Sequence, residues 1–365
     1  MTHENKEPLN VLFLGASFGV VLGMRVAAAG HRVTFACREQ EAALINKGKL
    51  ILRVATKQRT APVNIGPSHC QFAPVAAAPG DIDPQRHDLV CLAMQEPQYS
   101  LPGVRDLVKN IAAAGIPCLS IMNMPLPPYL EKIEIQGGNA AESAFTEAGL
   151  WKEMDSAVFT MASADPQAKR LDVEDTLLIS VTLPTNFKVA PFERPRDQAM
   201  LERLAGDIDG TRIKHEGALC QPCVRLRPHS SSHIPLSKWP MLITGNFRCL
   251  TDGAPISIGE AVNRNLCESR ELYDWITEIC LALGAEESIM VPFDAYGTAA
   301  EGLTLPSSLA RGLFAGATAA ERVDVLIQAL AGRHGMSHPV LDRIVEDISA
   351  TLERNRSKQG SKTPS

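Results

Sequence analysis

The chain has 365 residues, of which 45% are hydrophobic and 21% are charged, and its formal net charge is −5. This composition is that of an ordinary globular protein, and the length predicts two domains. The negative charge and the lack of a basic block argue against nucleic-acid binding, and no apolar run reaches the length of a membrane span.

Residues 11–38 combine an apolar run, a glycine turn, a helical segment and a second β-rich run. The apolar run 11–14 leads into the turn, the helical segment ends at Gly30, and the second run is 32–36. A βαβ unit of this kind aims backbone N–H groups and a helix N-terminus at one point, which suits a dinucleotide pyrophosphate. We therefore predict a nucleotide-binding turn made of Gly15, Ala16, Ser17, Phe18 and Gly19.

This turn departs from the usual Gly-x-Gly-x-x-Gly pattern, because Ser17 stands near the place of the second glycine. A small serine still allows a pyrophosphate to approach, so nucleotide binding is favoured over a purely structural βαβ unit. The turn also fits the Gly-x-Ser-x-Gly pattern of hydrolases. We disfavour that interpretation because the serine directly follows the first strand.

Arg38 follows the second β-rich run, where a nucleotide-binding fold contacts the ribose. An arginine there suits the 2′-phosphate of NADP, whereas an acidic residue suits the 2′-hydroxyl of NAD. Glu39 leaves some ambiguity, and a solvated arginine is the structural alternative. We predict NADP.

Apolar strands alternate with helices as far as residue 122, which predicts a parallel sheet. We predict helices at 41–48 and 100–114, strands at 50–54, 61–65, 87–94 and 116–122, and a loop over the Pro- and Ala-rich stretch 73–86. Ligands bind beyond the carboxyl ends of such strands, which is where Gly15, Arg38, Gln95 and Asn123 lie.

The rest of the chain divides into an extended middle segment and a helical region. The first domain is predicted to span 1–230, the second 231–355, and a disordered tail 356–365. We predict strands at 176–182 and 187–192, a helix from 200, and further helices at 257–265, 269–283, 306–315, 319–331 and 339–355.

Four residues of the middle segment raise the question of a metal site. Cys220 and Cys223 are separated by two residues in a Cys-x-x-Cys pattern, and His229 and His233 follow. The gap between Cys223 and His229 is too short for the structure that joins zinc-finger ligands, so we expect a flexible loop and no metal. The other cysteines lie mostly in apolar runs and are expected to be reduced, as in a cytoplasmic protein.

Several short blocks, in order, resemble the ketopantoate reductase (2-dehydropantoate 2-reductase) family. They are residues 14–19, 29–34, Arg38, 88–93, 122–123, Ser-Lys-Trp-Pro-Met-Leu at 237–242 and Pro-Ser-Ser at 306–308. The resemblance implies an α/β fold, in which a Rossmann-type NADP-binding domain precedes an all-helical domain like the C-terminal domain of 6-phosphogluconate dehydrogenase. It also implies a cytoplasmic enzyme of pantothenate biosynthesis that forms a dimer.

Lys238 is the candidate general acid. It begins an apolar helical run, so its stem is expected to be partly buried, and desolvation would lower its pKa and make it a better proton donor. The resemblance places it at the family's catalytic position, and a snorkelling lysine at a helix end is the alternative. Four-residue steps predict one helix face for Lys238, Leu242 and Asn246, although Leu242 replaces an asparagine of the family pattern.

The resemblance also supplies the remaining site residues. Asn123 would contact both the substrate carbonyl and the nicotinamide, Met94 and Gln95 would contact the cofactor, and Asn246, Ser308 and Glu321 would bind substrate. Ser307 or Ser308 could instead cap the helix that follows. Glu321 lies one residue beyond the family spacing and also completes a Thr318-x-x-Glu321 capping box, with Asp324 as a weaker substitute.

The sequence therefore predicts an NADPH-dependent reductase that transfers a hydride to a 2-oxo acid such as ketopantoate, with a lysine general acid. Two alternatives remain open: an opine-type NADP dehydrogenase that reduces an imine, and a non-catalytic NADP-binding sensor. The expected partners are a small 2-oxo acid and a second copy of the chain, with no nucleic acid and no membrane.

Overall fold

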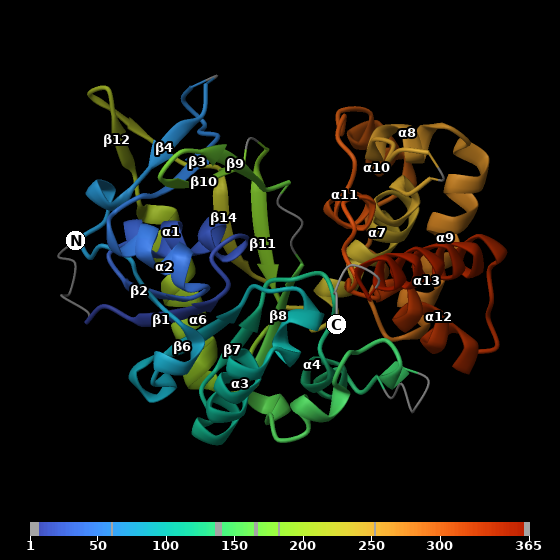
Figure 1. The fold of residues 1–365 in the computed structure, drawn as a ribbon, viewed down its shortest axis with the longest axis horizontal. Helices are drawn as coiled ribbons and strands as arrows, with labels where there is room; N and C mark the ends of the chain where they lie inside the picture. Colours follow the sequence, from blue (N-terminus) through green and yellow to red (C-terminus); the bar gives the residue numbers. More distant parts are fainter. Residues whose placement is uncertain are drawn as a thin grey trace. The chain divides into compact units, whose positions relative to one another are not determined.

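The computed structural model describes residues 7–59, 61–135, 141–163, 167–181, 183–251 and 253–360 (Figure 1). The chain divides into two compact units, which we call the first and the second unit. The first takes in the residues up to 134 and 149–235, and the second takes in 135–148 and the residues from 236 on. The first unit contains a largely parallel sheet and the second contains helices, which confirms the predicted α/β fold class.

An eight-stranded sheet, the main sheet, organises the first unit in the order β14-β11-β8-β7-β6-β1-β2-β5. Its strands are β1 (Asn10–Leu14), β2 (Arg32–Ala36), β5 (Val75–Ala77), β6 (Leu89–Leu92), β7 (Cys118–Ser120), β8 (Phe159–Ser163), β11 (Thr185–Val189) and β14 (Val224–Pro228). The strands from β5 to β8 are parallel, and β11 runs antiparallel to β8. From β5 to β8 the strand order is that of dinucleotide-binding folds.

The edge strand β5 lies inside the stretch 73–86, for which we predicted a loop. On the edge of β5 that faces away from β2, the backbone of Ala76 is paired with a side chain and not with another strand. The amide of Asn46 donates to the carbonyl of Ala76 and accepts from the N–H of Ala76, both at 2.8 Å. This short strand is held by β2 and Asn46 together, so the Pro-rich local sequence did not reveal it.

A four-stranded small sheet has the order β4-β3-β10-β9. Its strands are β3 (Leu50–Val54), β4 (Val63–Ile65), β9 (Lys169–Val173) and β10 (Thr176–Val181). Helix α1 (Gly19–Ala28) packs against β2 and β14 of the main sheet and against β3 and β10 of the small sheet. All its residues from Gly19 to Ala27 are buried, which explains why every one of them except Arg25 is apolar or glycine.

Other helices and one hairpin complete the first unit. They are α2 (Glu39–Asn46), α3 (Pro102–Ala114), α4 (Pro127–Lys132), α6 (Pro195–Gly210) and the hairpin β12 (Ile213–His215) with β13 (Ala218–Cys220). Arg25, in the last turn of α1, is fully buried among them. Its guanidinium donates to the carbonyls of Ile208 at 2.7 Å and Val224 at 3.2 Å, and so ties α1 to α6 and β14.

His31 is a second buried polar residue of the first unit. Its Nδ1 accepts the N–H of Leu9 at 3.1 Å, so the proton of the neutral ring sits on Nε2, which faces Asp207 at 3.2 Å. Burial lowers the pKa of His31 and outweighs the attraction of the Asp207 carboxylate. The residue is therefore a neutral structural link between the start of β2 and α6.

The second unit contains α7 (Trp239–Thr244), α8 (Ile258–Asn263), α9 (Leu266–Ala282), α10 (Phe293–Glu301), α11 (Ser308–Phe314), α12 (Val323–Arg333) and α13 (Pro339–Gly360). We did not predict α10, which carries Gly297 in its middle. Helix α13 includes residues 356–360, so the predicted disordered tail is wrong there, and 361–365 lie outside the described residues.

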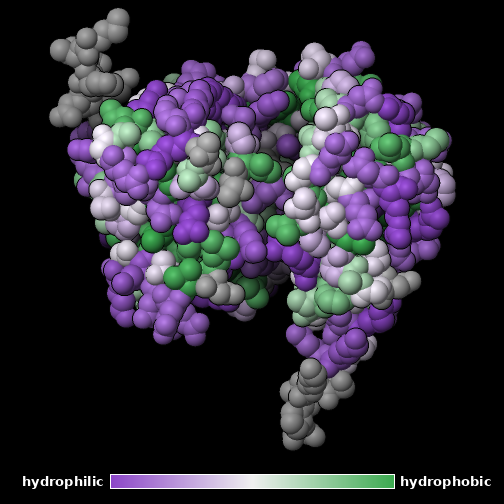
Figure 2. Space-filling model, turned by 90° about the horizontal axis from the view of Figure 1, so that it is seen from above, coloured by the Kyte–Doolittle hydropathy of each residue, from purple (hydrophilic) through white to green (hydrophobic). Residues whose placement is uncertain are grey.

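The face in Figure 2 is mostly hydrophilic, with hydrophobic residues in small groups. Among the helices described, none has the length and apolarity to cross a membrane.

Candidate functional site

The glycine turn after β1 is pressed against the carboxyl ends of two neighbouring strands. The N–H of Gly15 donates to the carbonyl of Ala36 at 2.9 Å, and the N–H of Ala93 donates to that of Leu14 at 3.0 Å. Gly15 has a φ of +109°, and a Cβ there would lie 2.8 Å from Cγ of Met94 and 3.0 Å from the carbonyl oxygen of Ala93. Only glycine fits this position.

The turn leads directly into the N-terminus of α1. Phe18 stands at the N-cap position, no described side chain caps the helix, and its first turn contains no acidic residue. Ser17 is exposed and Ala16 is buried beneath the turn. Uncapped N–H groups and the positive end of the helix dipole both favour an anion here.

Arg38 follows β2 and forms an ion pair with the side chain of Glu41. Its Nε and Nη2 lie 3.3 Å and 2.8 Å from the two carboxylate oxygens. The same carboxylate accepts from Nη1 of Arg170 on β9 at 2.8 Å. Burial alone would raise the pKa of Glu41, but the hydrogen bonds and charges of the two arginines prevail and lower it. Sequence reasoning missed Arg170, since no local pattern marks it.

Two further sequence-predicted groups follow β6 and β7. The N–H of Met94 donates to Oη of Tyr99 at 3.2 Å, and the N–H of Gln95 donates to Oε1 of Gln98 at 3.0 Å. Asn123 is half-buried beyond β7, and its Oδ1 is buried with no hydrogen-bond partner among the described residues. The first unit thus brings the turn, Arg38, Met94, Gln95 and Asn123 to the carboxyl edge of the main sheet, as the sequence predicted.

Lys238, in the second unit, is half-buried and stands at the N-cap of α7. The predicted single helix through Asn246 is wrong, because α7 ends at Thr244 and Asn246 begins a separate 3₁₀ turn. The break falls at Gly245. Beside it, the hydroxyl of Tyr296 donates to the carbonyl of Met241 at 3.0 Å and occupies the space that a Cβ of residue 245 would need.

Leu242 lies in the core rather than in a site. The residue is 2% exposed and lies in α7, a helix that packs against α9. The asparagine of the family pattern is therefore replaced here by a packing residue.

Asn246 lies beside the start of α11. The hydroxyl of Ser307 accepts the N–H of Ala310 at 3.1 Å and donates to the carbonyl of Asn246 at 2.7 Å. Ser307 is therefore the cap, and it leaves the exposed Ser308 next to the Asn246 segment. The second unit brings these two predicted substrate residues together.

Glu321 lies between α11 and α12 and is 9% exposed. The predicted Thr318 capping box is wrong, because α12 begins at Val323 with Arg322 at its N-cap. Asp324 is fully buried and forms a bidentate pair with Arg322, with contacts of 2.9–3.3 Å. Asp324 thus has a structural partner, which removes it as a substitute for Glu321.

Part of the Cys220–His233 stretch lies in strands, which corrects the expected flexible loop there. Cys220 ends β13, and Cys223 precedes β14 and pairs its N–H with the carbonyl of Ala55 at 2.8 Å. Nδ1 of His229 accepts the N–H of Ser231. Within the described ranges, no group of three or more His, Cys, Asp or Glu side chains is placed to hold a metal.

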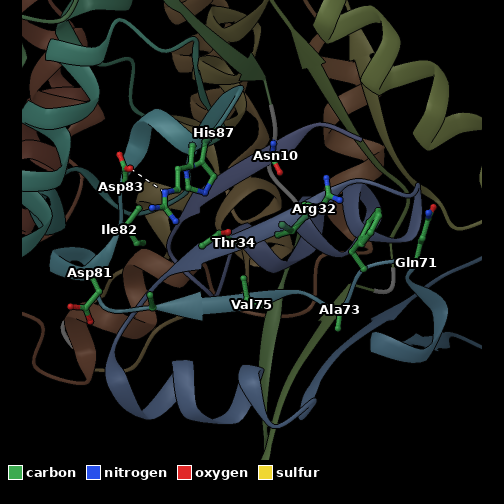
Figure 3. A pocket seen from close by; sticks show the side chains of 14 residues that line it. Asn10, Arg32, Thr34, Gln71, Ala73, Val75, Asp81, Ile82, Asp83 and His87 are labelled. Carbon is green, nitrogen blue, oxygen red and sulfur yellow. Dashed lines mark hydrogen bonds and ion pairs between the residues drawn. The ribbon is translucent and has the colours of Figure 1, made fainter. Parts of the chain in front are cut away.

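A cavity of about 740 Å³ opens at the other end of the main sheet (Figure 3). Asn10, Arg32 and Val75, the first residues of β1, β2 and β5, line it together with Thr34 and His87. Ligands of parallel sheets bind beyond the carboxyl ends of the strands, and none of the predicted site residues lines this cavity. We therefore place the candidate site at the glycine turn.

No family model matches the sequence, and no curated protein matches it. Solved structures do share its fold over 95% of the chain. A PanE/ApbA family ketopantoate reductase from Ralstonia eutropha JMP134 is 15% identical and fully covered, with a TM-score of 0.65. D-mandelate dehydrogenase, solved with NADH and anilino(oxo)acetate, is 12% identical and fully covered, with a TM-score of 0.64. A dimeric ketopantoate reductase from Staphylococcus aureus is 11% identical and fully covered, with a TM-score of 0.57. The chain therefore has the fold that ketopantoate reductases share with D-mandelate dehydrogenase.

Proposed function

We propose that this protein is an NADPH-dependent reductase of 2-oxo acids. The observation that carries the proposal is the glycine turn at the carboxyl edge of the main sheet, with Arg38 beyond the neighbouring strand β2. The turn presents a helix N-terminus to an anion, and Arg38 presents a guanidinium to a second one. The fold shared with reductases of 2-oxo acids supports the same conclusion.

The residues of the first unit fit a nicotinamide dinucleotide. Residues 15–19 would hold the pyrophosphate, Arg38 the 2′-phosphate, and Met94, Gln95 and Asn123 the nicotinamide end. Oδ1 of Asn123, which has no partner in the described part of the chain, supports this assignment, because an unsatisfied buried acceptor is costly unless a ligand supplies a donor. When bound, the reduced nicotinamide supplies the hydride.

The second unit would supply the proton and orient the substrate. The ammonium group of Lys238 donates a proton to the carbonyl oxygen as negative charge develops there. The side chains of Asn246 and the exposed Ser308 donate hydrogen bonds to the substrate, and the carboxylate of Glu321 accepts one from a substrate hydroxyl. Because Leu242 is packed in the core, this site has one polar group fewer than the family pattern, which favours a 2-oxo acid other than ketopantoate.

The test is the loss of NADPH absorbance against a panel of 2-oxo acids that includes ketopantoate and phenylglyoxylate, with NADH in parallel. Lys238→Ala should lower kcat by about 100-fold or more while NADPH binding is kept, because general acids contribute roughly 10²–10⁴-fold. Lys358→Ala, at the exposed end of α13, is the control. Unchanged turnover in Lys238→Ala would refute the role of the lysine.

Other outcomes distinguish the remaining possibilities. Turnover of ketopantoate would place the enzyme in pantothenate biosynthesis. Reduction that requires an added amine would identify an imine reductase, and tight NADPH binding without turnover would identify a sensor. Light scattering of the purified protein tests the proposed homodimer.

A further inference from the structure

The carboxylate of Glu41 is held between two arginines from distant parts of the sequence. Nη2 of Arg38 and Nη1 of Arg170 each lie 2.8 Å from the same oxygen, Oε1. Glu41 is only 10% exposed, whereas the side chains of Arg38 and Arg170 are 78% and 41% exposed. The two guanidinium groups therefore face solvent side by side above a buried carboxylate.

Different elements deliver the two arginines to this place. Arg38 is the N-cap of α2, and the preceding Cys37 is fixed by its N–H bond to the carbonyl of Ala77 at 3.1 Å. Arg170 lies on β9 of the small sheet, opposite Ile179 of β10, and is 129 residues from Glu41 in sequence. The small sheet thus adds a second cation at the position where the first unit would meet the ribose of a dinucleotide.

The pair of arginines has more donors than Glu41 can use. A guanidinium carries five N–H donors, and among the described residues the carboxylate accepts from three nitrogens: Nε and Nη2 of Arg38 and Nη1 of Arg170. An ion pair with so exposed an arginine is weak, so Arg38 can change partner easily. A phosphate dianion with three terminal oxygens is a stronger partner for two guanidinium groups at once.

We propose that Arg170 joins Arg38 in binding the 2′-phosphate of NADP, and that Glu41 is the internal counter-ion with which this phosphate competes. The inference rests on the proposed function and deepens it. NADH lacks the phosphate and leaves the Arg38–Glu41–Arg170 arrangement in place. The preference for NADPH then depends on a residue of the small sheet as well as on Arg38.

The test is calorimetric titration of the full-length protein with 2′,5′-ADP and 5′-ADP, and with NADPH and NADH. Arg170→Gln should weaken 2′,5′-ADP and NADPH by about tenfold, the loss of roughly one charge-assisted contact, and leave 5′-ADP and NADH nearly unchanged. Lys169→Gln is the matched control, because neighbouring strand residues point to opposite faces. It removes the same charge one residue away without touching Glu41. Arg170→Lys keeps the charge but loses the planar fork. Its affinity for 2′,5′-ADP should lie between the affinities of Arg170→Gln and Lys169→Gln.

Glu41→Gln tests the second half of the proposal. Removing the competing charge should tighten NADPH binding severalfold and leave NADH binding unchanged. Weaker NADH binding in Glu41→Gln would instead show that this carboxylate holds the 2′-hydroxyl of NAD, and would overturn the proposal. NADPH binding that is sensitive to Arg38→Gln but not to Arg170→Gln would overturn the role of Arg170 alone. Failure of both dinucleotides to bind the wild-type protein would overturn the proposed function as well.

Discussion

The replacement Gly15→Ala tests how closely the glycine turn approaches the end of β6. Gly15 has a φ of +109°, a conformation that costs an L-residue about 1–3 kcal/mol. The added Cβ would also meet Met94 at 2.8 Å and the backbone of Ala93 at 3.0 Å, and such overpacking costs typically 1–3 kcal/mol. Alanine restricts the unfolded chain and offsets about 0.4–1 kcal/mol of this. We expect a net loss of about 3 kcal/mol.

Gly115→Ala is the control that separates backbone strain from crowding. Gly115 ends α3 with a φ of +61°, and a Cβ there would have no described heavy atom within 4 Å. Only the left-handed conformation opposes alanine at this position, so the expected loss is about 1 kcal/mol. The difference between the two variants measures the contact between the turn and β6.

The assay is native-state hydrogen exchange with mass spectrometry, reported as the free energy of opening for peptides from β1 and β6. A titration with NADPH accompanies it, and Gly15→Ala should bind more weakly, since the turn must move. Equal free-energy losses in Gly15→Ala and Gly115→Ala, with NADPH binding intact in both, would refute the argument that the turn requires a glycine for close approach.

Further predictions concern stability. Burial lowers the pKa of His31, so the unfolded state takes up a proton first, and the free energy of unfolding should fall as the pH drops below 6.5, the ordinary pKa of histidine. In urea titrations at several pH values, the free energy of unfolding of His31→Gln should fall less than that of the wild type. An equal fall in both proteins would contradict the assignment of His31 as a neutral buried residue. Gly245→Ala should lose about 3 kcal/mol by displacing the Tyr296 hydroxyl, and Tyr296→Phe in the same chain should restore part of it. Arg322→Met should cost about 3–5 kcal/mol because it leaves Asp324 buried and unpaired, and adding Asp324→Leu should recover most of that loss. Thermal unfolding measures both pairs of variants, singly and combined. If the losses of the two single variants simply add in the combined variant, the contact between that pair of residues is contradicted.

The βαβ unit at the N-terminus could be predicted because its signals are local. An apolar run, a glycine turn and a helix ended by Gly30 follow one another within 11–38, and the structure has β1, α1 and β2 there. The positions of Arg38 and Asn123 follow from the same logic, since each comes just after a strand of the parallel sheet.

Features that depend on distant contacts could not be predicted. The small sheet pairs β3 with β10, far apart in sequence, and β10 in turn pairs with β9, which brings Arg170 to Glu41. The break before Asn246 depends on the hydroxyl of Tyr296, which approaches from α10, a helix absent from our predictions. Periodicity reports the preference of a segment, and it cannot report which side chain of another element occupies the adjacent space.

The two side-chain contacts at the borders of the main sheet limit how copies of this chain can associate. Outermost strands offer unpaired N–H and C=O groups, which can template pairing with another molecule. Here Asn46 engages both groups of Ala76 on β5, and Arg25 engages the carbonyl of Val224 on β14. Joining two main sheets edge to edge would break these bonds. An assembly of this protein is therefore expected to form through other surfaces, and the same two contacts protect the folded chain against strand-mediated aggregation.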